Sequence, residues 1–242
     1  MGVSAEARPA VAGLQGVGKM KNAKKILSPV ELETLQNRIA RLETRTDAEV
    51  VCAVATESGR YDRAESLCGL TVALSALLSA EKFLGMGTWE ESTGLSLGAQ
   101  AFTIVLGFVA GSVLASYWHG LRRLFVGGGE IEVEVQRSVQ QVFSQRGVGE
   151  THQRGGVLIY LSLFEHRLEI RCDRALMAKL PPSALTAIRD AVLSRLKAGD
   201  LAAGLLAGLD QAETALAEAM PPTGQSANRL ADTVLLFHPR PA

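Results

Sequence analysis

Two histidines and a serine are the residues of the C-terminal half best suited to proton transfer or nucleophilic attack. His152 and His166 flank an apolar run at residues 156–163, and Ser162 lies within that run. A nucleophilic site requires a hydroxyl or thiol with a neighbouring base, and the spacing of these three residues provides no such pair. We therefore interpret both histidines as solvated turn residues and Ser162 as part of a strand.

The cysteines and the overall charge narrow the class of protein. Cys52, Cys68 and Cys172 are widely scattered and show neither CxxC nor Cys/His spacing, so neither a disulfide framework nor a zinc site is expected. Cys52 and Cys172 have apolar neighbours on predicted strands, where burial makes a thiol unreactive. The 25 basic and 25 acidic side chains cancel, so the chain has no overall basic field for nucleic acid.

Two apolar segments interrupt the polar sequence. Residues 92–118 contain no Asp, Glu, Lys, Arg or His and would form a helix about 40 Å long, enough to cross a hydrocarbon core of about 30 Å. The uncharged residues 66–80 reach only about 22 Å, and the segment gains length by continuing through Glu81 and Lys82, which can snorkel or pair near a membrane face. The alternative for either segment is a buried helix of a soluble protein.

The charges that flank these segments predict their topology. Arginines stand on both outer sides, at Arg60, Arg63, Arg122 and Arg123, whereas the intervening turn holds one Lys and three Glu. Basic residues favour the cytoplasmic side, so we expect two membrane crossings with both termini cytoplasmic. The same arginines, and the cluster Lys19, Lys21, Lys24 and Lys25, are expected to face anionic lipid. No nucleic-acid partner is expected, because no aromatic stacking platform accompanies these charges.

Small residues at every fourth position predict how the two segments pack. They comprise Ala99, Thr103, Gly107, Gly111 and Ala115 in the second segment and Thr71, Ser75 and Ser79 in the first. We expect a helical hairpin with its closest approach at Gly107 and Gly111. The alternative is a homodimer seam through the same two glycines. Neither segment has an ionisable residue away from its ends, which argues against a proton relay or an ion pathway.

The remaining sequence predicts an α/β domain whose two parts are separated by the apolar segments. Residues 28–31 (SPVE) form a capping box before a helix expected to end near Thr44. The other expected elements are a buried strand at 49–55, a helix striped by Val135, Val139 and Val142, a strand hairpin at 156–172, a helix from Pro182 to Gly199, and a helix at 201–220. An isolated strand would leave its amides unpaired, so strand 49–55 must join the hairpin. Both parts then lie on one side of a membrane, which requires an even number of crossings.

This order of elements resembles the TPM domain family. The residues that carry the resemblance are LSPVELETLQNRIARLETRTDAEVVCAVA, RGVGETHQRGGVLIYLSLFEHRLEIRCDRAL and KAGDLAAGL. It implies an α/β fold in which a small mixed sheet lies between helices and a transmembrane hairpin interrupts the domain, as in some bacterial inner-membrane members. The corresponding division is a loosely ordered segment 1–26, a discontinuous domain 27–63 and 127–220, a hairpin insertion 64–126, and a tail 221–242.

The resemblance implies two different functions. Acid phosphatase chemistry and divalent-cation binding are associated with plant thylakoid members, whereas other relatives are regarded as accessory factors of membrane complexes. Family members often carry an acidic residue and Asn before the GVL strand, where this chain has His152, Gln153 and Arg154, and only Glu165 and Asp173 remain as candidate metal ligands. Hard cations prefer six or more oxygen ligands, so we interpret both carboxylates as surface charges and expect no cofactor.

The sequence therefore favours a noncatalytic accessory module over an enzyme. We expect the α/β domain to be tethered to the lipid bilayer by the hairpin and to bind a membrane-protein partner. The alternative is a metal-assisted phosphomonoesterase, which would need at least three acidic or imidazole groups at one end of the sheet.

Overall fold

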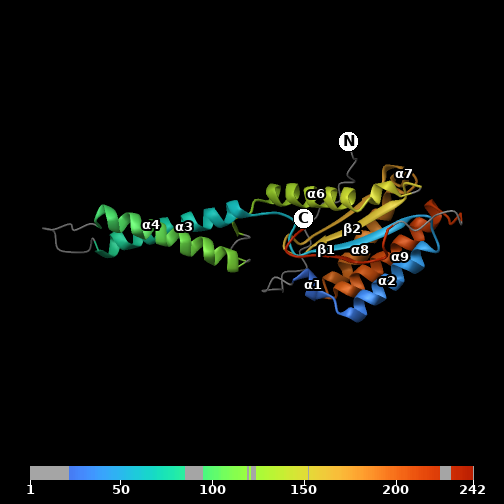
Figure 1. Cartoon of the computed structure of the whole chain (residues 1–242), viewed down its shortest axis with the longest axis horizontal. Coiled ribbons are helices and arrows are strands. Elements are labelled where there is room, and N and C mark those ends of the chain that lie inside the picture. Colours follow the sequence, from blue (N-terminus) through green and yellow to red (C-terminus); the bar gives the residue numbers. More distant parts are fainter. Residues whose placement is uncertain are drawn as a thin grey trace. The chain divides into compact units, whose positions relative to one another are not determined.

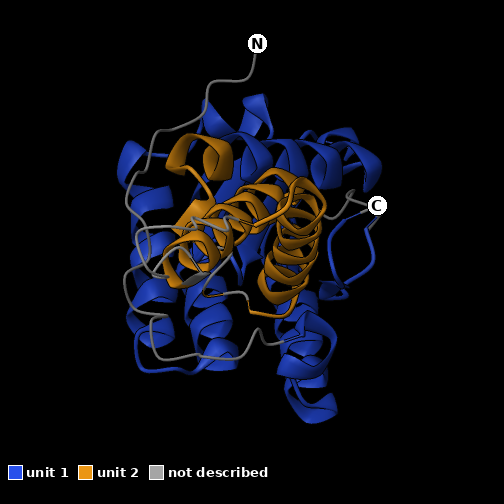
Figure 2. Cartoon of the chain, turned by 90° about the vertical axis from the view of Figure 1, so that its left-hand side faces the viewer, with its two compact units in different colours: residues 1–59, 133–242 blue, residues 60–132 orange. Residues whose placement is uncertain are grey.

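The computed structural model describes residues 22–84, 95–118, 120, 124–151, 153–223 and 230–241. The chain forms two compact units, one from residues 1–59 and 133–242 and the other from residues 60–132 (Figure 2). The first unit is an α/β fold and the second contains the two apolar helices.

A four-stranded mixed sheet forms the centre of the first unit, in the order β3-β2-β1-β4. The strands are β1 (Glu49–Ala55), β2 (Gly156–Ser162), β3 (Arg167–Cys172) and β4 (Leu235–Phe237). β1 runs parallel to β2 and to β4, and β2 pairs antiparallel with β3. The expected joining of strand 49–55 to the hairpin is therefore confirmed, with Cys52 opposite Ile159.

Helices cover both faces of this sheet (Figure 1). α1 (Ala23–Ile26), α2 (Pro29–Glu43), α8 (Pro182–Leu196) and α9 (Leu201–Ala219) lie on one face. α6 (Gly128–Gln145) lies on the other, and the short helix α7 (Arg174–Met177) follows β3. This is the expected α/β arrangement of a small mixed sheet between helices.

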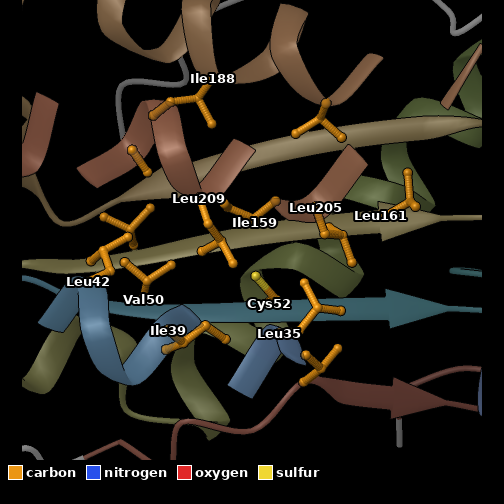
Figure 3. Close-up of a cluster of buried hydrophobic side chains, with 14 of the residues drawn as sticks. Leu35, Ile39, Leu42, Val50, Cys52, Ile159, Leu161, Ile188, Leu205 and Leu209 are labelled. Atoms are coloured by element: carbon orange, nitrogen blue, oxygen red, sulfur yellow. The ribbon is translucent and has the colours of Figure 1, made fainter. Parts of the chain in front are cut away.

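The main core lies between the sheet and α2, α8 and α9 (Figure 3). Alternate strand residues point to it, including Val50 and Cys52 of β1 and Ile159 of β2, and they meet Ile39 of α2 and Leu209 of α9. All residues of β1 and β2 are buried, because their other alternate residues face α6. Burial on both faces explains why these two strands are continuously apolar in sequence.

Local signals place the helix ends close to where the sequence predicts them. At the start of α2, the Glu31 amide donates to Ser28 Oγ over 3.3 Å and the Ser28 amide donates to Glu31 Oε2 over 2.7 Å, which completes the capping box. Past the end of α8, Gly199 has φ +84°, a conformation that L side chains rarely adopt. Asp200 then caps α9 by accepting from the Ala203 amide over 2.9 Å.

The two terminal segments differ from the expectation. Residues 221–242 are not simply a tail, because Leu235–Phe237 form β4 at the edge of β1. The Thr56 amide donates to the Phe237 carbonyl over 3.1 Å, so the C-terminal segment supplies partners to an otherwise open strand edge. Residues 23–26 form α1, whereas the rest of the expected loose N-terminal segment, residues 1–21, lies outside the described residues.

The second unit contains α3 (Asp62–Leu84) and α4 (Leu97–Tyr117), which pack against each other. Both are long and apolar enough to cross a membrane, judged by length and composition. Residues 85–94, which connect them, lie outside the described residues.

Candidate functional site

Large apolar side chains cover the outer surfaces of α3 and α4. Leu78 is 71% exposed, Phe102 is 68% exposed and Leu97 is 82% exposed. The set continues along both helices with Leu67, Leu70, Leu74, Ile104, Val105, Leu106, Phe108, Val109, Val113 and Leu114. Contiguous exposed apolar surface of this kind marks a membrane or protein interaction site, and here it encircles two helices of spanning length.

The contact between the two helices is close because of glycine. A Cβ added to Gly107 would lie 2.8 Å from the Cα of Ala73, and one added to Gly111 would lie 2.9 Å from the Cα of Gly69. Real Cβ atoms do not approach this closely, so only glycine fits at either position. Gly107, Gly111 and Ala115 are all buried on this face of α4. Both glycines therefore contact α3 of the same chain, as a helical hairpin requires.

The stripe expected on α3 does not take part in that contact. Thr71, Ser75 and Ser79 are exposed, so the prediction that they face α4 is wrong. α3 instead presents Gly69 and Ala73, whose smaller side chains let the backbones approach more closely. On α4, Ala99 and Thr103 of the expected stripe are half-buried.

The basic residues expected at a lipid surface are only partly described. Arg60 and Arg63 are exposed at the start of the second unit, and Arg60 Nε lies 3.2 Å from Asp62 Oδ2. Lys24 and Lys25 are exposed on α1. Four further predicted residues, Arg122, Arg123, Lys19 and Lys21, lie outside the described residues.

Buried polar residues gather at the carboxyl ends of the parallel strands in the first unit. This carboxyl-end cluster consists of Thr56, Glu57, Ser58, Ser138, Tyr160, Ser162 and Glu165. The carboxyl ends of parallel strands are where α/β folds commonly bind ligands, so we consider the cluster as the candidate site of this unit.

Glu165 is the centre of the carboxyl-end cluster. It is only 2% exposed, so its interpretation as a surface charge is wrong. Its carboxylate accepts from the Ser58 amide over 2.7 Å and from the Ser162 hydroxyl. The sequence did not reveal this burial, because the β2–β3 turn that carries Glu165 packs against the segment after β1, which is distant in sequence.

The neighbours of Glu165 extend the same network. Ser58 Oγ lies 3.0 Å from the Tyr160 hydroxyl, and the Ser138 hydroxyl donates to the Ser58 carbonyl over 2.6 Å. Burial raises the pKa of Tyr160 to about 12, which keeps this phenol protonated. Ser162 is fully buried, so a substrate has no access to its hydroxyl. The arrangement is a hydrogen-bonded structural network rather than a nucleophilic site.

The outer part of the carboxyl-end cluster joins α1 and the C-terminal segment to the end of β1. Thr56 Oγ1 accepts from the Ala23 amide over 2.9 Å and lies 2.9 Å from His238 Nδ1. Glu57 Oε1 lies 3.4 Å from Arg240 Nη1. These contacts fill the carboxyl end of β1 with α1 and the segment that follows β4.

The two predicted metal candidates lie at opposite ends of β3. Glu165 precedes this strand, whereas Asp173 follows it and caps α7 by accepting from the Ala175 amide over 2.9 Å. A strand of this length separates them by about 20 Å. Across the described ranges, no three His, Cys, Asp or Glu residues are grouped so as to hold a metal ion. The donor set that a metal-assisted phosphatase would need is not assembled there.

The remaining chemistry-bearing residues are two cysteines and two histidines. Burial raises the pKa of the Cys52 and Cys172 thiols to about 12, which agrees with their expected inertness. His166 lies in the β2–β3 turn with φ 53°, and His152 lies outside the described residues.

A second buried polar group lies at the amino end of β1, where the sequence pattern predicted no site. Asp47 Oδ2 accepts from Gln153 Nε2 over 2.8 Å and from Thr223 Oγ1 over 2.6 Å. The Thr46 hydroxyl donates to the Met220 carbonyl over 2.7 Å. These bonds fasten the end of α9 to the start of β1. A run of polar residues between a helix and a buried strand was the available signal.

Acidic side chains next to this group connect α2 to the C-terminal segment. Glu43 Oε1 accepts from the Val50 amide over 2.9 Å, and Glu49 Oε2 accepts from the Leu230 amide over 2.8 Å. Burial, together with the nearby carboxylates of Asp232 and Glu49, raises the pKa of Glu43 to about 8. Glu43 is therefore protonated at neutral pH.

Comparison with known proteins agrees with the expected resemblance. Residues 127–215 match the TPM domain family, a range that includes all of α6, the β2–β3 hairpin, α8 and most of α9. The solution NMR structure of BA42 protein from the psychrophilic bacterium Bizionia argentinensis is similar in fold, with a TM-score of 0.53 and 15% sequence identity. The similarity covers 88% of this chain and 96% of that protein. No curated protein matches the chain.

Proposed function

We propose that this chain, whose residues 127–215 match the TPM domain, is a noncatalytic accessory module tethered to a bacterial inner membrane. In this proposal α3 and α4 cross the bilayer as a hairpin, and the α/β unit lies at the cytoplasmic face, where it binds a membrane-protein partner. The observation that carries the proposal is the exposed apolar surface of both helices, which water would solvate poorly and lipid would cover.

The hydrogen bonds of hydroxyl groups in α3 and α4 support a lipid environment for these helices. Thr71 Oγ1 donates to the Leu67 carbonyl over 2.8 Å, Ser79 Oγ to Ser75 over 2.7 Å, and Thr103 Oγ1 to Ala99 over 2.9 Å. Within hydrocarbon a polar group must find its partner inside the protein, because no water is present. Bonds to the carbonyl four residues earlier satisfy this requirement without a neighbouring chain.

The sheet supports an even number of membrane crossings. β1 precedes the hairpin in sequence and β2 follows it, and the two strands pair directly. A single crossing would place these paired strands on opposite sides of the bilayer. The exposed arginines Arg60 and Arg63 lie just before α3 and in its first turn, and they favour the cytoplasmic side.

The buried carboxylate supports binding rather than catalysis. Glu165 accepts hydrogen bonds from Ser58 and Ser162 inside the first unit, and Asp173 is used as a helix cap. A tethered domain meets a membrane-bound partner at a high local concentration without additional contacts. The exposed surfaces of the α/β unit, rather than its buried polar groups, are thus the part we assign to the partner.

Cysteine labelling in whole cells tests the tether and its topology. The three native cysteines are first replaced by Ser or Ala, and single cysteines are then introduced by Lys197→Cys after α8 or Thr88→Cys between the two helices. A membrane-impermeant maleimide is expected to label Thr88→Cys in intact cells and Lys197→Cys only after permeabilisation. Release of the chain from membranes by alkaline carbonate, or labelling of both positions from the same side, would contradict the proposal.

The accessory role has a separate test. The detergent-purified chain is compared with a variant in which an unrelated two-span hairpin replaces residues 60–126, so that only the α/β unit is shared. A partner recruited by the α/β unit should copurify with both chains. A partner that is lost with the exchanged hairpin would place recognition in the membrane helices instead. Phosphomonoesterase activity of the purified chain with divalent cations would contradict the noncatalytic role.

A further inference from the structure

The charged residues of α3 stand at two levels along its axis. Asp62, Arg63 and Glu65 occupy the first turn, and Glu81 and Lys82 occupy the last turns. The residues between Glu65 and Glu81 carry no charge. At about 1.5 Å per residue these two glutamates are about 24 Å apart along the helix, which is shorter than the hydrocarbon core of a typical bilayer, about 30 Å.

A hydrogen bond between the helices holds Glu81 at its level. Gln100 Nε2 of α4 donates to Glu81 Oε1 over 3.0 Å and is also 3.1 Å from the Leu95 carbonyl. A free glutamate at a helix end can extend along the axis towards water. Glu81 is instead directed sideways onto α4, so the Glu81–Gln100 pair marks a polar layer at a defined height of the hairpin.

The close contacts between the helices prevent this layer from shifting. Gly107 lies against Ala73, and Gly111 lies against Gly69 and Val72. Near the other end, the Ser112 hydroxyl is 3.5 Å from the Glu65 carbonyl. A slide of α4 by one helical turn would bring one glycine to the contact of the other and a larger residue, Thr103 or Ala115, to the remaining contact, where the closely packed backbones leave no room for it. Because the two helices are fixed relative to each other along their axes, the polar levels at Glu65 and Glu81 limit the apolar length of the whole hairpin.

Aromatic residues mark the other polar level. Tyr117 and Trp118 are 81% and 64% exposed, and they follow Ser112 by one to two turns of α4. Tyr and Trp prefer the interface between hydrocarbon and water. Together with the charged first turn of α3, they place one membrane surface near Glu65 and leave the Glu81–Gln100 layer for the opposite surface.

We infer that the hairpin fits a thin bilayer, with a hydrocarbon thickness of about 24 Å between the Glu65 level and the Glu81–Gln100 layer. This inference rests on the proposed membrane tether and adds which bilayer the tether prefers. In a thicker bilayer the Glu81–Gln100 layer would enter hydrocarbon, or the lipid around the hairpin would have to thin.

Reconstitution in vesicles of graded thickness tests the inference. The full chain carrying Trp89→Phe, which leaves Trp118 as its single tryptophan, is placed in phosphatidylcholines with monounsaturated chains of 14, 16, 18, 20 or 22 carbons. Competition with brominated lipid, read as quenching of Trp118 fluorescence, reports relative lipid affinity. We expect the highest affinity at 14 to 16 carbons and an affinity lower by about threefold at 20 to 22 carbons.

Substitutions in the polar layer test its cause. The double variant Glu81→Leu and Gln100→Leu lengthens the apolar span and should move the optimum to longer chains. Glu81→Gln keeps the size of the side chain and an acceptor for Gln100 but removes the charge, so we expect a smaller shift in the same direction. This variant provides the test if the double variant does not reconstitute. Glu33→Leu, an exposed position on α2, is the matched control and should leave the optimum unchanged.

The outcomes separate this inference from the proposed function. A chain that enters none of the vesicles would contradict the membrane tether itself. A chain that enters all of them with an optimum at 18 carbons or longer, or with an optimum that no substitution at the polar layer moves, would overturn the thin-bilayer inference alone.

Discussion

Individual residues of the α/β unit show how strongly tertiary contacts alter the meaning of a charged side chain. Glu165 and Glu43 are both glutamates in polar stretches of sequence, yet Glu165 is buried in a hydrogen-bonded network and burial raises the pKa of Glu43 to about 8. Each carboxyl group lies against a segment that is distant in the chain. The consequences for stability differ, because Glu165 has donors around it and Glu43 has neighbouring carboxylates.

Glu43 predicts a stability that depends on pH. Its ordinary pKa is 4.5 and its pKa in the folded chain is about 8. Between these values the unfolded chain releases the proton while the folded chain retains it, so stability present below pH 4.5 is lost as the pH rises towards 8. Glu43→Gln keeps an acceptor for the Val50 amide without this titration. We expect it to raise the free energy of unfolding by about 1–3 kcal/mol at pH 7 to 8.

Thermal or denaturant unfolding of the purified chain across pH 4 to 9 measures this effect. The difference between Glu43→Gln and the unmodified chain should disappear near pH 4.5. Glu33→Gln, at an exposed position of the same helix, should change stability little at any pH. A constant difference between Glu43→Gln and the unmodified chain across the range would show that proton release is not its cause.

The hydrogen bonds of Glu165 predict a loss of stability when its carboxylate is removed. Glu165→Ala leaves the Ser58 amide and the Ser162 hydroxyl without their acceptor inside the protein, and such a loss costs about 2–4 kcal/mol. Glu165→Gln retains one acceptor oxygen and should cost less. Equilibrium unfolding of both variants checks the order. Equal stability of Glu165→Ala and the unmodified chain would mean that the network contributes nothing to folding.

At the scale of elements, the packing of α3 on α4 depends on two glycines rather than on a long small-residue stripe. Gly107 and Gly111 have no room for a Cβ, whereas Thr71, Ser75 and Ser79 are exposed. An exposed stripe with the same period is therefore no guide to which face of α3 makes the contact. Only the paired helix identifies it.

Larger residues at the two glycines should separate the helices. Gly107→Leu and Gly111→Leu each place side-chain atoms where the backbone of α3 lies, so we expect the hairpin to lose about 2 kcal/mol or more through forced displacement. Cysteines introduced at Glu81 and Gln100, whose side chains are hydrogen-bonded across the two helices, would report the change as a lower yield of cross-linking by a short bifunctional maleimide. Gly98→Leu is the control, because a Cβ there meets nothing within 4 Å. Equal cross-linking in all variants would contradict the intramolecular contact.

At the scale of the whole molecule, the α/β unit is assembled from segments on both sides of the hairpin. Gly59 and Glu134 lie next to each other in this unit, since a Cβ built on Gly59 would be 2.5 Å from Glu134 Cγ. The ends of the insertion therefore meet without the inserted residues. The core of the α/β unit is formed by its own sheet and helices, which is the property expected of an independently folding domain.

Removal of the insertion should give a water-soluble α/β unit. A chain in which a short Gly/Ser linker replaces residues 60–130 keeps the four strands and their main core and loses the exposed apolar helices. We expect it to remain soluble without detergent and to unfold cooperatively, as measured by gel filtration and circular dichroism. Aggregation of the shortened chain, with the full chain stable in detergent, would show that the α/β unit depends on the hairpin.

Features that depend on neighbouring residues could be predicted from the amino-acid sequence alone. The SPVE capping box, the apolar strands at 49–55 and 156–162, and the two apolar segments are local patterns, and the structure contains the corresponding elements. The pairing of β1 with β2 was also predictable, because a buried strand must satisfy its amides somewhere.

The contacts between distant segments depend on the folded chain as a whole. The three-residue strand β4 is stable only beside the open edge of β1, Glu165 is buried only because the β2–β3 turn packs on the segment after β1, and α3 contacts α4 through Gly69 and Ala73. Burial and strand pairing across long sequence separations depend on the whole fold. A local sequence pattern does not indicate which distant surface will cover it.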